Sequence, residues 1–317
     1  MAVSLPRLAA MHPYPPVGPA VEFHHVDVFS ATPYSGNSLA VFVDPPALDA
    51  AALSRITREL RHFETIFVWT PTTAGNLRAR VFDLVEELDF AGHPVLGAAA
   101  VLHRLDRPPE GERRTWTFAL PVRTVTVHTR GHANGHVSAL LDKGRPDVVG
   151  RPSPADRPAI AAAIGLAESD LDKALPPEIL STGLRYLVVP VRDRHALARA
   201  RITHASFARF LGDLGAQFAY ALDATTLEGR HWNNDGVLED VATGSAAGCV
   251  AAYLLRHGRA DGGEELSLAQ GRFVGRPSRI AITAYGTPDD VERVTVGGDV
   301  AVVGTGRLHA LPHGDRA

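Results

Sequence analysis

Two stretches of the chain place acidic residues shortly before a run of small residues that opens an apolar helix. The first is Glu239–Gly248, which reads Glu-Asp-Val-Ala-Thr-Gly-Ser-Ala-Ala-Gly. The second is Asp89–Gly97, which reads Asp-Phe-Ala-Gly-His-Pro-Val-Leu-Gly. The first N–H groups of a helix have no partner within the helix, and the helix dipole adds positive character there. Each stretch therefore predicts a helix end that can hold a carboxylate ligand.

The alternative is ordinary helix capping, in which Thr243 or Ser245 bonds the first turn and the small residues serve close packing. The similarity between the two stretches favours a functional interpretation, although their match slips by one residue. It indicates two similar lobes, each presenting a helix N-terminus. If the two ends face each other, they form a cleft for a small anion.

Glu64 is the candidate general acid/base. It stands between a predicted helix and an apolar run, with Phe63, Ile66 and Phe67 nearby. One interpretation is a solvated carboxylate at the mouth of a strand. The other is a desolvated acid, because burial can raise a carboxyl pKa by up to roughly 3–5 units. A shift of about 2 units lets a carboxyl group hold a proton near neutrality, as general acid/base catalysis requires.

His93 is open to three roles at this point: a core histidine, a capping partner or a proton donor to substrate. No second histidine or carboxylate stands at ligand spacing on the helix that follows. We therefore expect no metal site around His93.

Composition limits the function classes. The length of 317 residues predicts about two domains, and 45% hydrophobic with 21% charged residues is typical of a soluble globular protein. A net charge of −3 and a pI near 6.6 argue against nucleic-acid binding. No apolar run is long enough for a membrane span. The single cysteine, Cys249, excludes an intrachain disulfide and fits a cytoplasmic protein.

Periodicity predicts many strands and few helices. Strands are expected at 21–29, 39–43, 77–83, 115–118, 122–128, 186–191, 217–222, 265–268, 279–284, 291–296 and 300–303. Helices are expected at 49–61, 153–164 and 204–211, and after Gly92 and Ser245, the last ending near Gly258. This pattern indicates an α+β fold in which each lobe is a curled sheet around a helix.

The expected domain organisation has three parts. Residues 1–20 form a flexible arm. Residues 21–142 form the first lobe, completed by a C-terminal strand at about 300–310, and residues 143–299 form the second lobe. Residues 143–158 carry four prolines and two glycines, which is typical of a connection between lobes.

Seven short motifs, in order over about residues 22–308, resemble those of the PhzF-like isomerases. They are Gly36–Val41, Glu64–Phe67, Glu87–Pro94, Ser181–Leu184, Glu239–Ala246, Gln270–Ser278 and Val296–Gly298. The resemblance implies a diaminopimelate-epimerase-like fold of two pseudo-symmetric lobes, each a barrel-like sheet around a central helix, with the active site between them. It also implies a homodimer that uses no cofactor and no metal.

The resemblance also implies roles for individual residues. Glu64 corresponds to the acid/base that moves a proton between carbons, and Asp240 and His93 correspond to further catalytic groups, with Asp240 assisting or relaying protons. The residues implied to hold a substrate carboxylate are Gly92, His93, Gly244 and Ser245.

Some positions depart from the family pattern. Phe63 stands where serine commonly precedes the glutamate, and Val241 stands where proline usually follows the aspartate. Asp83-Leu84 replaces a frequent Thr-Pro, and Ser38 replaces another proline. None of these changes removes a proton-carrying group, and Phe63 makes the surroundings of Glu64 drier.

Two hypotheses follow. The first is a cofactor-independent isomerase that moves a proton between carbons of a small cyclic or aromatic-precursor carboxylic or amino acid, in secondary-metabolite biosynthesis. The second is a non-catalytic, dimeric small-molecule-binding or scaffold protein of the same fold. A racemase with two facing thiols is excluded, because Cys249 is the single cysteine and Gly92 stands near where the other thiol is expected.

Overall fold

The computed structural model describes residues 20–312, except residues 74, 90, 91 and 134. The N-terminal arm expected at residues 1–20 therefore lies outside the described residues, apart from residue 20. None of the helices in the described part is long and apolar enough to cross a membrane.

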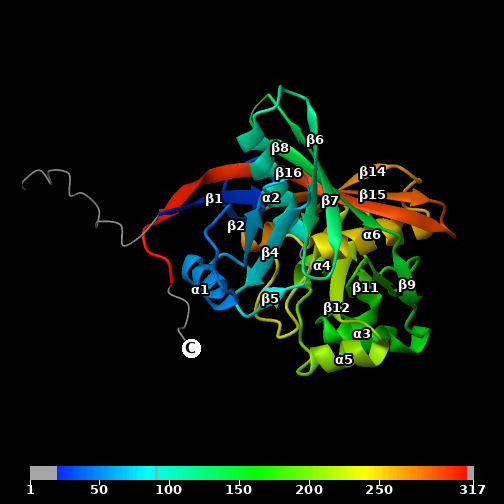
Figure 1. The fold of residues 1–317 in the computed structure, drawn as a ribbon. Coiled ribbons are helices and arrows are strands. Elements are labelled where there is room, and N and C mark those ends of the chain that lie inside the picture. Colours follow the sequence, from blue (N-terminus) through cyan, green and yellow to red (C-terminus); the bar gives the residue numbers. More distant parts are fainter. Residues whose placement is uncertain (1–19, 74, 90–91, 134, 313–317) are drawn as a thin grey trace, which may run out of the picture.

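The first lobe is a barrel of eight strands (Figure 1). They follow one another in the order β1 (Val21–Val28), β2 (Asn37–Val43), β3 (Glu64–Trp69), β4 (Leu77–Asp83), β6 (Arg113–Ala119), β7 (Thr124–Gly131), β8 (Val137–Gly144) and β16 (Val291–Leu308). Antiparallel pairing of β1 with β16 closes the ring. The short β5 (Glu87–Leu88) pairs with β4.

The helix α2 (Gly92–Asp106) runs inside this barrel and contacts most of its strands. Its residues from His93 to His103 are buried on every side, as expected of a helix enclosed by a sheet. Small residues permit this enclosure. A Cβ atom on Gly97 would lie 2.4 Å from Leu39 Cδ2 and 3.1 Å from Val28 Cγ2, so glycine allows α2 to pack closely against β1 and β2 without moving these side chains.

The helix α1 (Ala50–Leu60) covers the part of the outer face of the barrel formed by β2, β3 and β4. In β2, Leu39 and Val41 face the inner core, whereas Phe42 packs outward with Leu53 of α1. This two-sided burial explains why β2 reads as a continuous apolar run and not as an alternating one. Asp49 caps α1 by accepting a hydrogen bond from the backbone N–H of Ala52 at 2.8 Å.

The second lobe continues from β16 as a curled sheet. Its strands follow the order β15 (Ser278–Gly286), β14 (Glu265–Gln270), β13 (Glu228–Arg230), β12 (Phe218–Asp223), β11 (Arg185–Pro190), β10 (Glu178–Ser181) and β9 (Asp147–Gly150). The central helix α6 (Gly244–Arg256) packs against β16, β15, β10 and β11. The predicted α+β fold of two pseudo-symmetric lobes, each with a curled sheet around a central helix, is confirmed.

Three further helices cover the other face of the second sheet: α3 (Arg157–Ala163), α4 (Arg194–Arg199) and α5 (Phe207–Leu214). Val188 of β11 faces the α6 side, whereas Leu187 and Val189 face the outer helices. In Figure 1, α3 and α5 lie below β11 and β12, on the side away from the barrel.

The strand β16 links the two lobes. Its first part pairs with β15, its middle part with β8, and its last part with β1. The sequence predicted two strands here, at 291–296 and 300–303, with Gly297 and Gly298 in the gap between them. That prediction was wrong. Gly297 is a point of close backbone approach, since a Cβ atom there would lie 2.4 Å from the carbonyl oxygen of Ala139.

Replacing Gly297 with alanine is expected to lower the free energy of unfolding by about 1–3 kcal/mol or more, because backbone on β8 must move to make room. Gly304→Ala on the same strand is the matched control, since a Cβ there meets nothing within 4 Å. Urea unfolding of both variants measures the difference. Equal free energies of unfolding for the two variants would show that the close approach of β16 to β8 at Gly297 does not require glycine.

The local sequence pattern did not predict β8, β10 or α4. It predicted that α5 begins at His204, whereas the helix begins at Phe207. Residues 143–158, expected to be a connection, contain the end of β8 and the whole of β9. These strands are short or interrupted by polar residues, so their formation depends on neighbours that lie far away in the sequence.

Candidate active site

A cavity of about 330 Å³ opens between the two lobes. Glu64 and His93 reach it from the barrel, and Asp240 and Ser245 reach it from the second lobe. The glycines that begin the two central helices, Gly92 and Gly244, also line it. All six predicted site residues thus meet in one place. Phe90 and Ala91, which belong to one of the motifs, lie outside the described residues.

The start of α6 is left without a side-chain cap. Thr243 occupies the capping position, but its side chain makes no capping hydrogen bond. Its Oγ1 instead donates to Asp240 Oδ2 at 2.6 Å. The hydroxyl of Ser245 is hydrogen-bonded to the Tyr186 hydroxyl at 2.7 Å. Gly244 and Ser245 of the first turn line the cavity at the positive end of the helix dipole, where an anion site is expected.

Glu64 is the first residue of β3, and its side chain is 20% exposed. Its Oε2 is buried, and none of the described residues gives that oxygen a hydrogen-bond partner. Burial, together with the nearby charges of Asp240 and Asp83, raises the pKa of Glu64 to about 8. Glu64 is therefore a largely protonated carboxyl group near neutrality, poised to exchange a proton.

His93 lies beside this carboxyl group, with its Nδ1 3.4 Å from Glu64 Oε2. Its Nε2 is buried and unpaired among the described residues. Burial lowers the pKa of His93, against the opposing influence of Asp240, so the imidazole is neutral. The structural reading of His93 as an ordinary core histidine leaves that unpaired nitrogen unexplained, since buried polar atoms are normally satisfied.

Asp240 is held firmly from both lobes. Besides Thr243, the amide of Asn37 donates to Asp240 Oδ1 at 3.4 Å, and the side chain of Gln270 donates to the backbone carbonyl of Asp240 at 2.9 Å. Asn37 also donates to the carbonyl of Ala242 at 3.1 Å. The loop before α6 is thereby fixed against Asn37 at the start of β2.

Two cavity residues were not singled out from the sequence. Lys143 comes from the end of β8, a strand that local patterns missed, and it is buried. Burial lowers the pKa of Lys143 to about 8, and the charge of Arg123 acts in the same direction. Tyr186 lies in a predicted strand, but only the fold shows that its hydroxyl reaches Ser245. Near pH 7 Lys143 is mostly an ammonium, which gives the cavity a cationic group.

Among the described residues, the His and carboxylate group with atoms close enough to share a metal ion lies outside this cavity. The groups that do line the cavity are proton carriers, hydroxyls, helix N–H groups and one ammonium. Such a set can bind a small anion and move a proton on it.

Comparison with known proteins identifies the family of the chain. A model of the family described as phenazine biosynthesis-like protein matches residues 26–306. The chain is similar to a trans-2,3-dihydro-3-hydroxyanthranilate isomerase of Pseudomonas chlororaphis, with 33% identity over 302 residues that cover 90% of this chain and 99% of that protein.

Solved structures agree with this placement. A protein from Pseudomonas aeruginosa, described as a predicted epimerase, matches with a TM-score of 0.82 and 43% identity, over 91% of this chain and 99% of that one. A hydroxyproline epimerase from Agrobacterium vitis, at 12% identity and a TM-score of 0.59 over 91% of this chain and 92% of that one, shares the fold alone. The resemblance stated from the motifs is confirmed. The chain belongs to the phenazine biosynthesis-like protein family, and it is a PhzF-like isomerase.

Proposed function

We propose that this isomerase moves a proton between two carbons of a small cyclic carboxylic or amino acid, with Glu64 as the general acid/base and no cofactor. The observation that carries the proposal is Glu64, which lines the cavity and whose buried Oε2 has no hydrogen-bond partner among the described residues. The similarity to a trans-2,3-dihydro-3-hydroxyanthranilate isomerase supports a cyclic amino-acid precursor as substrate class.

The reaction conserves all atoms. The ionised Glu64 takes a proton from a carbon next to an unsaturated system, and the electron pair of the broken C–H bond enters that system. The resulting carboxylic acid then returns the proton to a second carbon on the same face, and a new C–H bond forms. Negative charge that develops in between is stabilised by the helix N–H groups and by the cationic Lys143.

Substrate binding is assigned to the paired helix ends. A substrate carboxylate would contact Gly92 and His93 at the start of α2, or Gly244 and Ser245 at the start of α6, because both ends line the cavity. Neutral His93 can donate a hydrogen bond to the substrate. Asp240, fixed by Thr243, raises the pKa of Glu64 and can relay a proton.

Lys143→Met is expected to raise KM for an anionic substrate by about 10- to 100-fold and to change kcat less. The reason is that methionine keeps most of the side-chain volume and removes the ammonium. In the wild type, kcat/KM is expected to fall above about pH 8, where Lys143 loses its proton, and the variant should lose this fall. Steady-state kinetics between pH 6 and 10 measure both effects. An unchanged KM would remove Lys143 from substrate binding.

Ser245→Ala is expected to raise KM by about tenfold, since the hydroxyl is lost from the start of α6 while the backbone N–H groups remain. Thr182→Val is the matched control. Thr182 lines the same cavity, but its hydroxyl donates to the Ser245 carbonyl at 3.2 Å. A larger effect from the control than from Ser245→Ala would argue that the hydroxyl acts on packing and not on substrate.

The proposal is tested by incubating the wild-type protein in deuterium oxide with a panel of cyclic and aromatic-precursor amino acids, including trans-2,3-dihydro-3-hydroxyanthranilate. NMR reads deuterium that enters substrate or product carbons. Deuterium uptake by one chemical class identifies the substrate class. Tight binding of such acids with no exchange and no product would favour the alternative, a non-catalytic small-molecule-binding or scaffold protein of the same fold.

We further propose that the protein works as a homodimer in the cytoplasm. The support is its family membership and the reducing surroundings that one buried cysteine suits. Light scattering coupled to size-exclusion chromatography tests the assembly, with a mass near twice 33.8 kDa expected. A mass near 33.8 kDa at micromolar concentration would contradict it.

A further inference from the structure

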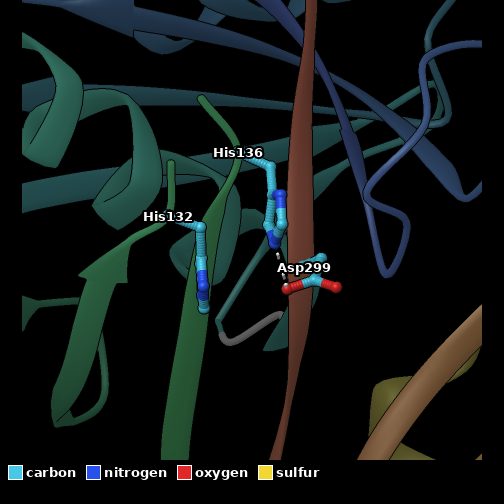
Figure 2. A group of neighbouring side chains, drawn as sticks. All are labelled: His132, His136 and Asp299. Atoms are coloured by element: carbon cyan, nitrogen blue, oxygen red, sulfur yellow. Dashed lines mark ion pairs between the residues drawn. The ribbon is translucent and has the colours of Figure 1, made fainter. Parts of the chain in front are cut away.

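A second group of reactive side chains lies at the turn between β7 and β8, outside the active-site cavity. His132 and His136 flank this turn, and Asp299 reaches them from β16 (Figure 2). The backbone N–H of His132 donates to the carbonyl of His136 at 3.1 Å. The two histidines are therefore cross-strand neighbours, and their side chains lie on one face of the hairpin.

The three side chains are close enough to share one ion. The imidazole rings stack with centroids 4.4 Å apart and planes 15° from parallel. His136 Nε2 lies 3.2 Å from Asp299 Oδ1, and one ligand atom from each residue lies within 4.8 Å of the others. Two ligands of a tetrahedral zinc ion, each about 2.0–2.2 Å from the metal, are about 3.3 Å apart. The His136–Asp299 pair already has that spacing.

The donor set selects the class of metal. Two imidazoles and one carboxylate suit Zn²⁺ and its neighbours in the transition series, whereas Ca²⁺ and Mg²⁺ prefer sites made of oxygen atoms. Three protein ligands leave a fourth position for water. His132 is partly exposed, so its ring can tilt out of the stack toward Asp299.

Ions have a path to this group. His132 and Asp299 line a surface cavity of about 720 Å³, and the Asp299 side chain is 41% exposed. Glu265 lines the same cavity and adds negative charge, while Arg113, Arg130 and Arg279 on its walls are positive, so the ligands themselves and not the charge of the cavity would select the ion. His132 Nε2 is hydrogen-bonded to Ser138 Oγ at 2.9 Å. Metal binding through Nδ1 would keep this bond as the contact that orients the ring.

We propose that His132, His136 and Asp299 form a binding site for a divalent transition-metal ion, with Zn²⁺ the best fit. The bound ion would tie the β7–β8 hairpin to β16, the strand that both lobes share. It would therefore stabilise the barrel without entering the isomerase reaction. The proposal is independent of the one made for Glu64.

The test uses the full chain without a polyhistidine tag, stripped of metal with chelator and titrated with Zn²⁺ by calorimetry. We expect one ion per chain and a rise in Tm of at least about 2 °C at saturation. His136→Ala and Asp299→Asn should each weaken binding by at least tenfold and abolish the rise in Tm. His195→Ala, an exposed histidine on α4, is the matched control and should bind as the wild type does.

Two measurements distinguish the proposed metal site from the active site. Glu64→Gln should leave Zn²⁺ affinity unchanged, and Cu²⁺ bound in place of Zn²⁺ should show electron paramagnetic resonance coupling to two imidazole nitrogens, reduced to one in His136→Ala. Unchanged Zn²⁺ affinity in both His136→Ala and Asp299→Asn would overturn the proposal, as would the absence of stoichiometric binding by the wild type up to about 1 mM.

Discussion

Replacing Glu64 with glutamine is expected to abolish isomerisation and, at the same time, to stabilise the folded protein in alkaline solution. Loss of a positioned general acid/base costs about 10²- to 10⁴-fold in rate, and here one group serves both half-reactions, so the upper end is expected. The amide keeps the size of the side chain but cannot ionise. Turnover of the substrate found in the deuterium panel measures the first effect.

The stability effect follows from the pKa of Glu64. Its value in the folded protein, about 8, lies above the ordinary 4.5, so the stability that the protonated group contributes is complete below pH 4.5 and is lost as pH rises through 8. At about 1.4 kcal/mol per unit, the loss reaches at most about 5 kcal/mol, and partial exposure of the side chain lowers it.

The glutamine variant should keep this stability at high pH, because its amide does not ionise. Its Tm should exceed that of the wild type at pH 9, and the difference should shrink toward pH 5. Glu59→Gln, on the exposed side of α1, is the matched control and should change neither rate nor Tm. A glutamine variant that is less stable than the wild type at pH 9 would show that Glu64 is not a destabilised, desolvated carboxyl group.

The second large effect is expected from Asp240→Asn. In the wild type, kcat at saturating substrate should rise about tenfold per pH unit below about pH 8 and level off above it, because the first step needs ionised Glu64. Removing the charge of Asp240 lowers the pKa of Glu64, so the inflection should move to lower pH. The plateau should also fall by about 10²-fold, since a proton-relaying group is lost.

Asp83→Asn separates these two contributions. Asp83 pairs with Glu64 across β3 and β4 and also raises its pKa, but it acts through charge alone. This variant should shift the inflection to lower pH and keep most of the plateau rate. If Asp83→Asn lowers the plateau as much as Asp240→Asn does, Asp240 acts only through the pKa of Glu64 and relays no proton.

The parts of the site that could be predicted are those whose residue types and spacing lie within a short stretch of the sequence. An acid followed by small residues marks the start of α2 and of α6, and the motif around Glu64 marks the carboxyl group. Capping by Thr243 or Ser245, the alternative, was wrong, because both side chains bond elsewhere: to Asp240 and to Tyr186. Short-range patterns cannot show which of two possible partners a hydroxyl takes.

Other features depend on contacts between distant segments. Lys143 lies near the end of a strand whose sequence alternates too weakly to be recognised, and it lines the cavity together with residues of the second lobe. The gap between the two strands predicted around Gly297 is continuous strand, because β16 pairs there with both β8 and β15. The cluster of His132 and His136 with Asp299 joins a hairpin to a strand near the C-terminus. No local pattern brings these segments together.

The central claim is that Glu64 itself carries the proton from one carbon to the other. The most direct test uses substrate labelled with deuterium at the donor carbon, in ordinary water, under single-turnover conditions. With wild-type enzyme, part of the deuterium is expected at the acceptor carbon of the product, and Glu64→Gln is expected to give no transfer. Product formed by the wild type with no deuterium at the acceptor carbon, at any enzyme concentration or quench time, would mean that separate groups remove and deliver the proton.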